Sequence, residues 1–454
     1  MLGVRLAKPE RPIHDDWRRV AIRPRDSALL GISFRPRQVE AFGLGGPAIL
    51  DSLLEYPFDL LRLGAYWDRI EPTAGEFDTQ ELDWQLAAAE RAGKKVILSI
   101  GPIKNFGYPE YYVPKHQLER PLREGALVRP EDQTSLLSAA RRFISRVVTK
   151  YRNRDSVVAW QLEHEAVDPL GFEHSWRLGR DFVESELATL RDCDPSRPVM
   201  MNGFLPTSSL VQLSQSWRTR DQGDSLAVAA QLADIVGFDY YPRNALLRLG
   251  ARTVYADGSA AKPPGSLFAA LREHGRRWMV AEGQAEPWET TTVPPNPPGK
   301  SMFTCGPHHV IENYNAAISW SSRETPLYAY LFWGAEYWIL RARSGDSSYL
   351  DAFQRLLAVG FRLRAGLRLA ARVLGPSTFV CLILVGVKVL ALPDISRQVA
   401  QHGGVMVVAA AAGGGSLPQL AAADDATESL TFGLQRGRGA APKRGAVIFD
   451  QATT

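Results

Sequence analysis

The chain has 454 residues, of which 45% are apolar and 22% are charged. This balance excludes a mainly disordered chain and allows either one large domain or two to three smaller ones. The formal net charge is only +4, and Lys and Arg alternate with Asp and Glu over the first 360 residues, so this part has no basic block of the kind that binds nucleic acid.

The cysteines and the N-terminal segment, residues 1–28, limit the possible locations of the protein. Cys193, Cys305 and Cys381 are far apart and odd in number, which predicts neither a disulfide framework nor a CxxC metal pair. The first residues, MLGVRLAKPERPIHDDWRR, carry charges that interrupt any apolar core of a secretory signal. We therefore expect a cytoplasmic protein.

From about residue 29 to residue 360, short apolar runs alternate with amphipathic segments. Each run is rich in β-branched or aromatic residues, which is typical of strands. The expected strands are residues 29–34, 59–64, 95–101, 157–162, 198–203, 234–241, 277–283 and 327–334.

The segments between these runs predict helices. In residues 79–93, Leu82, Leu86 and Ala89 share one helical face, and Gly93 can end the helix. Residues 131–151 show the same periodicity. Eight strand–helix units predict a (β/α)₈ barrel over residues 29–360. The alternative, a doubly wound open sheet, lacks a GxGxxG turn to support it.

The composition changes after residue 360. Residues 361–372 are basic, and residues 373–392 are apolar apart from Lys388. This apolar stretch nearly reaches the length that spans a bilayer, but Gly375 and Pro376 interrupt its start. We expect residues 361–454 to form a disordered or loosely packed extension, with membrane association through residues 373–392 as the alternative.

In a barrel of this kind, the C-terminal ends of the strands carry the function. The expected strand ends are rich in acids, aromatics and one arginine: Arg62, Glu163, His164, Glu165, Asp239, Tyr240, Tyr241, Glu282, Trp333 and Glu336. Glutamates on the fourth and seventh strands, about 5 Å apart, would suit a retaining glycosidase. Arg62 near the seventh-strand carboxylate would keep that group ionised. Taken singly, each glutamate is better explained by an ordinary strand-end salt bridge, but the pair together with Arg62 favours catalysis.

Five stretches resemble motifs of the clan A retaining glycoside hydrolases, a (β/α)₈ superfamily that includes cellulase-like and β-galactosidase-like enzymes. They appear in the strand order of that superfamily and lie within about residues 28–360. The stretches are LLRLGAYWDRIEPTAGEFD (60–78), VVAWQLEHEA (157–166), VGFDYYP (236–242), WMVAEGQAEPW (278–288) and LFWGAEYW (331–338).

The resemblance implies a retaining β-glycoside hydrolase that acts on a carbohydrate without a cofactor. It implies that Glu165 is the acid/base and that Glu282 is the nucleophile. A tyrosine that hydrogen-bonds the nucleophile corresponds to Tyr241. The implied substrate-binding residues are Arg62, Trp67, His164, Tyr241, Trp333 and Glu336.

The chain departs from the motifs of the superfamily at one position, and two other glutamates compete for the catalytic roles. The superfamily usually has Asn directly before the acid/base, where it holds the 2-hydroxyl of the sugar; this chain has His164. Glu163 competes for the role of the acid because strand alternation puts it on the same side as Glu165. The motif register favours Glu165. Glu286, in the loop after the seventh strand, is a weaker rival for the nucleophile.

Metal binding and binding without catalysis are the alternatives to a glycosidase. Possible ligands are Glu163, His164, Glu165, His174, His308 and His309, but the first strand has no His-x-His pair, so we expect no catalytic metal. We place His308 and His309 in a proline-flanked loop. Two alternatives to a glycosidase remain: a catalytically degenerate carbohydrate-binding barrel and a metal-dependent barrel hydrolase. The sugar, the linkage and the oligomeric state are undetermined by the sequence.

Overall fold

The computed structural model describes residues 3–107, 111–119, 126–131, 134–168, 176–206, 223–289, 296–359, 405–407 and 447–449. The chain divides into two compact units, Met1–Phe361 and Arg362–Thr454. In the second unit the structure describes one antiparallel strand pair, Val405–Val407 (β16) and Val447–Phe449 (β17). The apolar stretch 373–392 and the expected loose extension therefore lie almost wholly outside the described residues.

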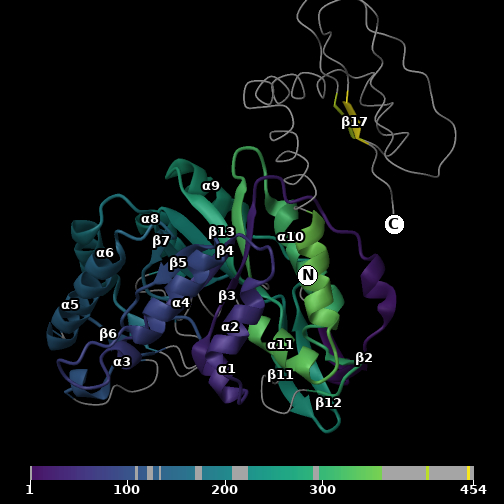
Figure 1. The fold of residues 1–454 in the computed structure, drawn as a ribbon, viewed down its shortest axis with the longest axis horizontal. Coiled ribbons are helices and arrows are strands. Elements are labelled where there is room, and N and C mark those ends of the chain that lie inside the picture. Colours follow the sequence, from purple (N-terminus) through teal and green to yellow (C-terminus); the bar gives the residue numbers. More distant parts are fainter. Residues whose placement is uncertain are drawn as a thin grey trace, which may run out of the picture. The chain divides into compact units, whose positions relative to one another are not determined.

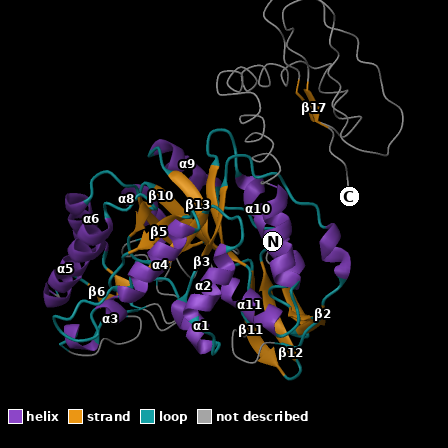
Figure 2. Ribbon diagram, in the orientation of Figure 1, coloured by secondary structure: helices purple, strands orange, loops and turns teal. Residues whose placement is uncertain are grey.

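Eight parallel strands form a closed barrel in the first unit (Figure 2). Neighbouring strands follow chain order around the barrel, and the last strand pairs with the first. The predicted (β/α)₈ barrel is thus confirmed, with each predicted strand present. The strands are Leu29–Ser33 (β3), Leu60–Gly64 (β4), Lys95–Ser99 (β5), Val157–Gln161 (β7), Val199–Phe204 (β9), Ile235–Tyr240 (β10), Arg277–Gln284 (β13) and Leu327–Trp333 (β15).

Helices surround the barrel on its outside (Figure 1). They are Pro36–Ala41 (α1), Gly46–Leu54 (α2), Trp67–Ile70 (α3), Gln80–Arg91 (α4), Thr134–Tyr151 (α5), Arg180–Cys193 (α6), Ser225–Leu232 (α8), Gly265–Glu273 (α9), Pro307–Trp320 (α10) and Ala335–Arg343 (α11), with residues 348–359 also helical. Two short 3₁₀ helices cover Asp15–Arg19 (η1) and Lys115–Gln117 (η2). No helix among the described residues is both long and apolar enough to cross a membrane.

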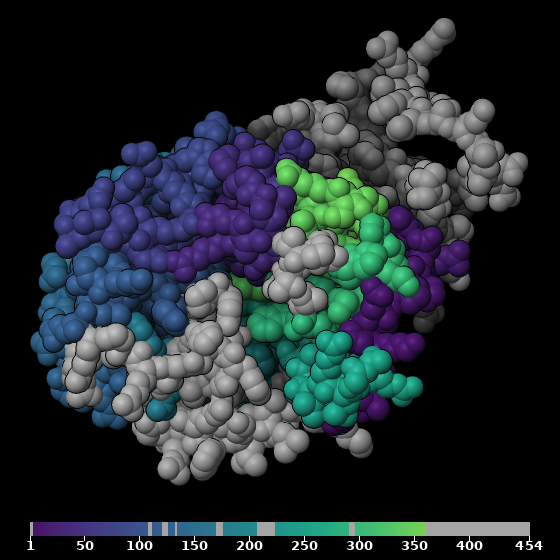
Figure 3. Space-filling view, turned by 90° about the horizontal axis from the view of Figure 1, so that it is seen from below, coloured from purple at the N-terminus to yellow at the C-terminus, as the bar shows by residue number. Residues whose placement is uncertain are grey.

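Short strands outside the barrel lie in the N-terminal segment and in several loops. Gly3–Ala7 (β1), Arg243–Leu249 (β11) and Arg252–Asp257 (β12) form a three-stranded antiparallel sheet. In Figure 3, the teal residues of the β11–β12 hairpin lie beside the purple N-terminal residues. Two further pairs join Glu10–Pro12 (β2) to Lys300–Met302 (β14), and Leu127–Val128 (β6) to Arg177–Leu178 (β8).

Strand alternation divides the barrel core into an outer and an inner part. Side chains that point outward, such as Leu61 and Leu63 on β4, join the large cluster that packs against the helices. Inward side chains form a separate apolar cluster within the barrel: Leu60, Ile97, Ala159, Met200, Ile235, Met279, Ala281, Ala329 and Leu331. Every member is fully buried. This plug gives the barrel a solid floor beneath the strand ends.

The helix predictions are also confirmed where the structure describes them. In α4, Leu82, Leu86 and Ala89 are buried on one face. Gly93 follows that helix with a φ of +66°, a left-handed conformation that glycine adopts without steric cost. In α5, which was expected from residue 131, the described helix begins at Thr134.

Candidate active site

A layer of buried polar side chains lies directly above the apolar plug. On several barrel strands, the inward-facing residue two positions beyond an apolar plug residue is polar. Leu60 is followed in this way by Arg62, Ala159 by Gln161, and Met200 by Asn202, and Asp239 on β10 joins this layer by accepting a hydrogen bond from Asn202. All four polar residues are at most 2% exposed, so they must satisfy one another's hydrogen-bonding groups.

Glu282 is the carboxylate that the polar layer holds most tightly. Arg62 Nη1 donates to Glu282 Oε1 at 2.6 Å, and the Tyr241 hydroxyl donates to Oε2 at 2.6 Å. His164 Nδ1 lies 3.6 Å from Oε1. Burial raises the pKa of Tyr241 well above its usual range, and the nearby Glu282 charge raises it further, so Tyr241 remains a protonated donor at neutral pH.

Glu163 and Glu165 follow the end of β7 with unusual backbone conformations. β7 ends at Gln161, and the φ angles of Glu163 and Glu165 are +48° and +43°. The expectation that strand alternation places both side chains on one side is therefore wrong, because neither residue is in a strand. Left-handed conformations are costly for residues other than glycine and persist where the surrounding contacts hold them.

Backbone contacts fix these two residues differently. The Glu163 carboxylate accepts hydrogen bonds from the backbone N–H groups of Ile103, at 3.1 Å, and Lys104, at 2.5 Å. The Lys104 ammonium donates to the backbone carbonyl of Glu165 at 2.6 Å. Glu163 thus ties the β7 end to the loop after β5, whereas the buried Glu165 carboxyl hydrogen-bonds Asp239 in the polar layer.

Burial perturbs the acids around this segment. It raises the pKa of Glu163 to about 7, although the two backbone N–H bonds oppose the shift. Glu186, on α6, is fully buried, and both burial and the Glu163 charge raise its pKa well above the usual range. Burial, and next the Glu282 charge, raise the pKa of Asp239 well above its usual range, while a hydrogen bond with Glu165 lowers it. Clusters of perturbed carboxyls are typical of functional sites.

An aromatic group lies next to the carboxylates. Phe106, Tyr241 and Trp333 form a small buried cluster at the strand ends, and Phe204 stacks on Tyr241 with a centroid distance of 6.4 Å. The Arg62 guanidinium lies 4.1 Å from the Phe106 ring centre. Aromatic faces of this kind pack well against the apolar faces of sugars, but they also stabilise the loops that carry them.

Arg35, which the sequence analysis did not single out, binds both remaining glutamates. Its guanidinium makes a bidentate ion pair with Glu286, at 2.7 and 2.8 Å, and also donates to Glu336 at 2.6 Å. The same guanidinium lies 4.3 Å from the Trp333 ring centre. Glu286 and Glu336 are therefore parts of a buried ion-pair cluster beside Trp333.

Trp67 is the one predicted site residue that the structure does not bring into this cluster. Its ring is fully buried in the outer core and packs 5.4 Å from the ring of Phe143 on α5. Its indole N–H donates to Glu71 at 2.8 Å. The predicted role of Trp67 in substrate binding is therefore corrected to a packing role, because the side chain faces the helix layer.

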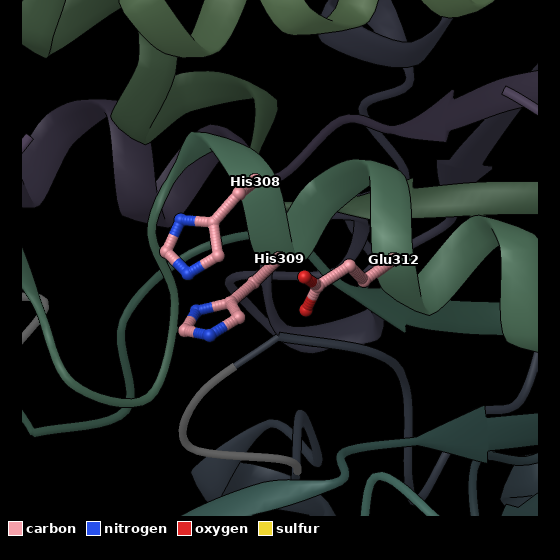
Figure 4. Close-up of side chains that lie close together, drawn as sticks. All are labelled: His308, His309 and Glu312. Carbon is pink, nitrogen blue, oxygen red and sulfur yellow. The ribbon is translucent and has the colours of Figure 1, made fainter. Parts of the chain in front are cut away.

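His308, His309 and Glu312 lie close enough together to suggest a metal site (Figure 4). They belong to the first turns of α10, so placing the two histidines in a loop was wrong. His309 Nδ1 accepts a hydrogen bond from the backbone N–H of Gly306 at 2.9 Å, which caps the helix. The proton of the neutral ring must then be on Nε2, and neither nitrogen offers a lone pair to a metal. Arg243 also binds Glu312, at 3.3 Å.

His164, Asp239 and Glu282 form a second cluster with metal-like spacing. Here N–H groups already point at the ligand atoms: Arg62 donates to Glu282 Oε1, and the Asn202 amide lies 2.8 Å from His164 Nδ1. A cation at this point would have to displace a guanidinium. The donor set fits an anionic carboxylate held by hydrogen bonds better than it fits a metal centre.

Arg35, Lys104, Gln161 and Asn202 were not among the site residues predicted from the sequence. Two of these had a usable signal: Gln161 and Asn202 are polar residues two positions beyond an inward-facing apolar residue of the same strand. Arg35 and Lys104 had none, because they lie in loops just beyond their strands.

No family model and no curated protein matches the chain. Among solved structures, a GH5_18 protein from Streptomyces cattleya in complex with GlcNAc is 13% identical over 74% of this chain and 81% of that chain, with a TM-score of 0.46. Xylanase 10B from Thermotoga petrophila RKU-1 is 12% identical, with coverages of 73% and 94% and a TM-score of 0.44.

The β-galactosidase from Rahnella sp. R3 is 13% identical over 48% of this chain, with a TM-score of 0.31. That match spans only 40% of the β-galactosidase. At these scores the likenesses carry no argument about activity, and the barrel follows from the strand pairing of this chain.

Proposed function

We propose that the chain is a retaining β-glycoside hydrolase in which Glu282 is the nucleophile and Glu165 is the acid/base. The observation that carries the proposal is the pair of hydrogen bonds that Glu282 accepts. Arg62 and Tyr241 each donate to one of its oxygens at 2.6 Å, at the C-terminal strand ends above the apolar plug. This arrangement pairs the carboxylate with a fixed positive charge and orients it, as a nucleophile requires.

The proposed reaction has two steps, and Glu282 and Glu165 take part in both. In the first step, a Glu282 oxygen forms a bond to the anomeric carbon, the glycosidic C–O bond breaks, and the Glu165 proton goes to the leaving oxygen. In the second step, water attacks the anomeric carbon, gives its proton to Glu165 and releases Glu282. Trp333, His164 and Arg62 contact the bound sugar or orient the groups around it. Glu336 acts indirectly, through Arg35.

The stereochemical course tests the mechanism. Hydrolysis of an aryl β-glycoside, followed by proton NMR of the released sugar, should show the β-anomer first, because two displacements retain configuration. The first appearance of the α-anomer would contradict the proposal.

Matched glutamine variants test the assignments. Glu282→Gln should abolish turnover of every aryl glycoside. Glu165→Gln should lose far more activity on a substrate with a poor leaving group than on a dinitrophenyl glycoside, whose leaving group needs no proton. Glu163→Gln and Glu286→Gln are the controls for the two rivals. A selective loss of activity in either control variant would assign the catalytic role to that residue instead.

Two other results would replace the proposal. Oligosaccharide binding without turnover, unchanged in Glu282→Gln, would identify a binding barrel. Loss of activity with a chelator would identify a metal-dependent hydrolase, since the carboxylate pair needs no metal.

A further inference from the structure

Three side chains of the polar layer form a directed series of hydrogen bonds that ends on His164. Arg62 Nε donates to Gln161 Oε1 at 2.7 Å. Gln161 Nε2 donates to Asn202 Oδ1 at 3.0 Å, and Asn202 Nδ2 lies 2.8 Å from His164 Nδ1. A guanidinium has only N–H donors, so Arg62 fixes which end of the Gln161 amide faces it. Gln161 then fixes the orientation of Asn202 in the same way.

A second contact at each amide supports the same orientation. Gln161 Nε2 also donates to the backbone carbonyl of Glu163 at 3.4 Å. Asn202 Nδ2 also donates to Asp239 Oδ2 at 2.6 Å. Each NH₂ group therefore has an acceptor for both of its hydrogens. A flipped amide would lose these contacts and bring two acceptors together.

We infer that this series holds His164 as a neutral ring with its proton on Nε2. The Asn202 hydrogen occupies the Nδ1 lone pair, and Arg62 Nη2, 3.4 Å from the same atom, is a second donor toward it. Among the residues that the structure describes, the charged and titratable groups near the ring include Arg62, Asp239 and Glu282. Glu282 would favour a proton on Nδ1, but it is 3.6 Å away and already neutralised by Arg62 at 2.6 Å.

This inference deepens the proposed function, and its consequence at the substrate rests on that proposal. A ring protonated on Nε2 can donate one hydrogen bond, so His164 donates to the 2-hydroxyl of the sugar, as the amide of an asparagine would. It adds no second positive charge beside Glu282, which is already paired with Arg62. Gln161 and Asn202 are then positioning residues that act through His164.

The tautomer can be measured without any substrate. Two-bond ¹H–¹⁵N correlation spectra of ¹⁵N-histidine-labelled protein distinguish both neutral tautomers and the cation. The chain has eight histidines, and the signals missing in His164→Asn identify His164. We expect a protonated Nε2 and an unprotonated Nδ1 from pH 6 to pH 8. A proton on Nδ1 in this range, in either the other tautomer or the cation, would overturn the inference.

A variant tests whether Asn202 causes this state. Asn202→Asp replaces the donor with an acceptor, and we expect Nδ1 of His164 to gain a proton. Asn313→Asp is the matched control: Asn313 is equally buried and bonds Gln284 and Arg243 instead. It should leave the His164 signals in place. Unchanged His164 signals in Asn202→Asp would overturn the role of Asn202. If that variant does not fold, the spectrum of the unmodified protein still decides the tautomer.

Kinetics separates this inference from the proposed function. The ratio of kcat/KM for an aryl β-glycoside to that for its 2-deoxy analogue should fall about tenfold in His164→Phe, as expected for one lost hydrogen bond. In the unmodified enzyme this ratio should stay constant from pH 6 to pH 8, because the ring does not titrate. A ratio that changes with pH in this range would overturn the inference. A protein that shows the Nε2–H pattern but hydrolyses nothing would overturn only the proposed function.

Discussion

Asp168 is a buried acid at the end of the segment that carries Glu165. Its Oδ1 accepts a hydrogen bond from the backbone N–H of Ser225 at 3.0 Å, while its Oδ2 is buried without a partner among the described residues. Burial raises the pKa of Asp168 to about 7. Such a group favours the folded state when it is protonated and disfavours it when it must ionise.

The sign of the effect follows from proton binding. Between the unfolded pKa of about 3.9 and the folded value, the folded chain holds a proton that the unfolded chain has lost. The Asp168 contribution to stability is therefore complete below about pH 4 and is lost as the pH rises toward 7. The full loss is on the order of 4 kcal/mol. Asp168→Asn should match the unmodified protein at pH 4 and unfold at a higher temperature at pH 8.

Thermal unfolding at both pH values measures this difference. Asp155→Asn, at an exposed position, is the control and should change little at either pH. An Asp168→Asn effect of equal size at pH 4 and pH 8 would show that the carboxyl does not titrate in this range.

Tyr241 and Tyr240 form a matched pair for the role of one hydroxyl. The Tyr241 hydroxyl binds Glu282, whereas the buried Tyr240 hydroxyl has no hydrogen-bond partner among the described residues. Hydrogen bonds to charged groups contribute about 1.5–3 kcal/mol, so Tyr241→Phe should lower kcat/KM on aryl glycosides by roughly 10- to 150-fold. Tyr240→Phe should leave kcat/KM unchanged. Equal effects in both variants would argue that Tyr241 only packs.

At the scale of elements, closure of the barrel depends on small residues where strands approach each other. A Cβ atom at Gly31 of β3 would lie 1.9 Å from the backbone oxygen of Leu60 on β4. Backbone cannot move that far without breaking the β3–β4 ladder. Gly31→Ala should therefore lower the free energy of unfolding by about 3 kcal/mol or more.

Urea unfolding measures this loss. Gly45→Ala is the control, because a Cβ atom there meets nothing within 4 Å and the φ of Gly45 is −83°. A similar midpoint for Gly31→Ala and Gly45→Ala would contradict the close approach.

At the scale of the whole molecule, the barrel unit completes its core before residue 360. β15 closes the barrel against β3, and residues 348–359 form a helix whose Phe353 ring packs against Phe332. We expect a chain that ends at residue 360 to unfold at the same temperature as the full chain and to keep its turnover of aryl glycosides. Calorimetry and kinetics on both chains check this boundary. Aggregation or a large loss of stability in the shorter chain would place part of the domain beyond residue 360.

The sequence by itself determined the barrel and named candidates for its site. Short apolar runs rich in β-branched or aromatic residues, separated by amphipathic segments with stop signals such as Gly93, predicted every barrel strand, because local sterics and burial decide these elements. Strand alternation marks Arg62, Gln161 and Asn202 as inward-facing above the apolar plug. Motif order added Glu165, Glu282 and Tyr241 to this set.

Only the tertiary structure decided where individual side chains point. The pairing of β13 with β10 and β15 is irregular near Glu282, and a Cβ atom at Gly283 would strike Tyr330 in the outer core. Glu282 therefore faces inward, although strict alternation from Ala281 would turn it outward.

Trp67 was wrongly predicted to bind substrate for a related reason, since contacts with the distant helix α5 fix its orientation. The proton on His164 likewise depends on Arg62, which is 102 residues away in the chain. Local periodicity assigns a residue to a face, but bulges, loop partners and hydrogen bonds between strands settle its final direction, because they join segments that are distant in sequence.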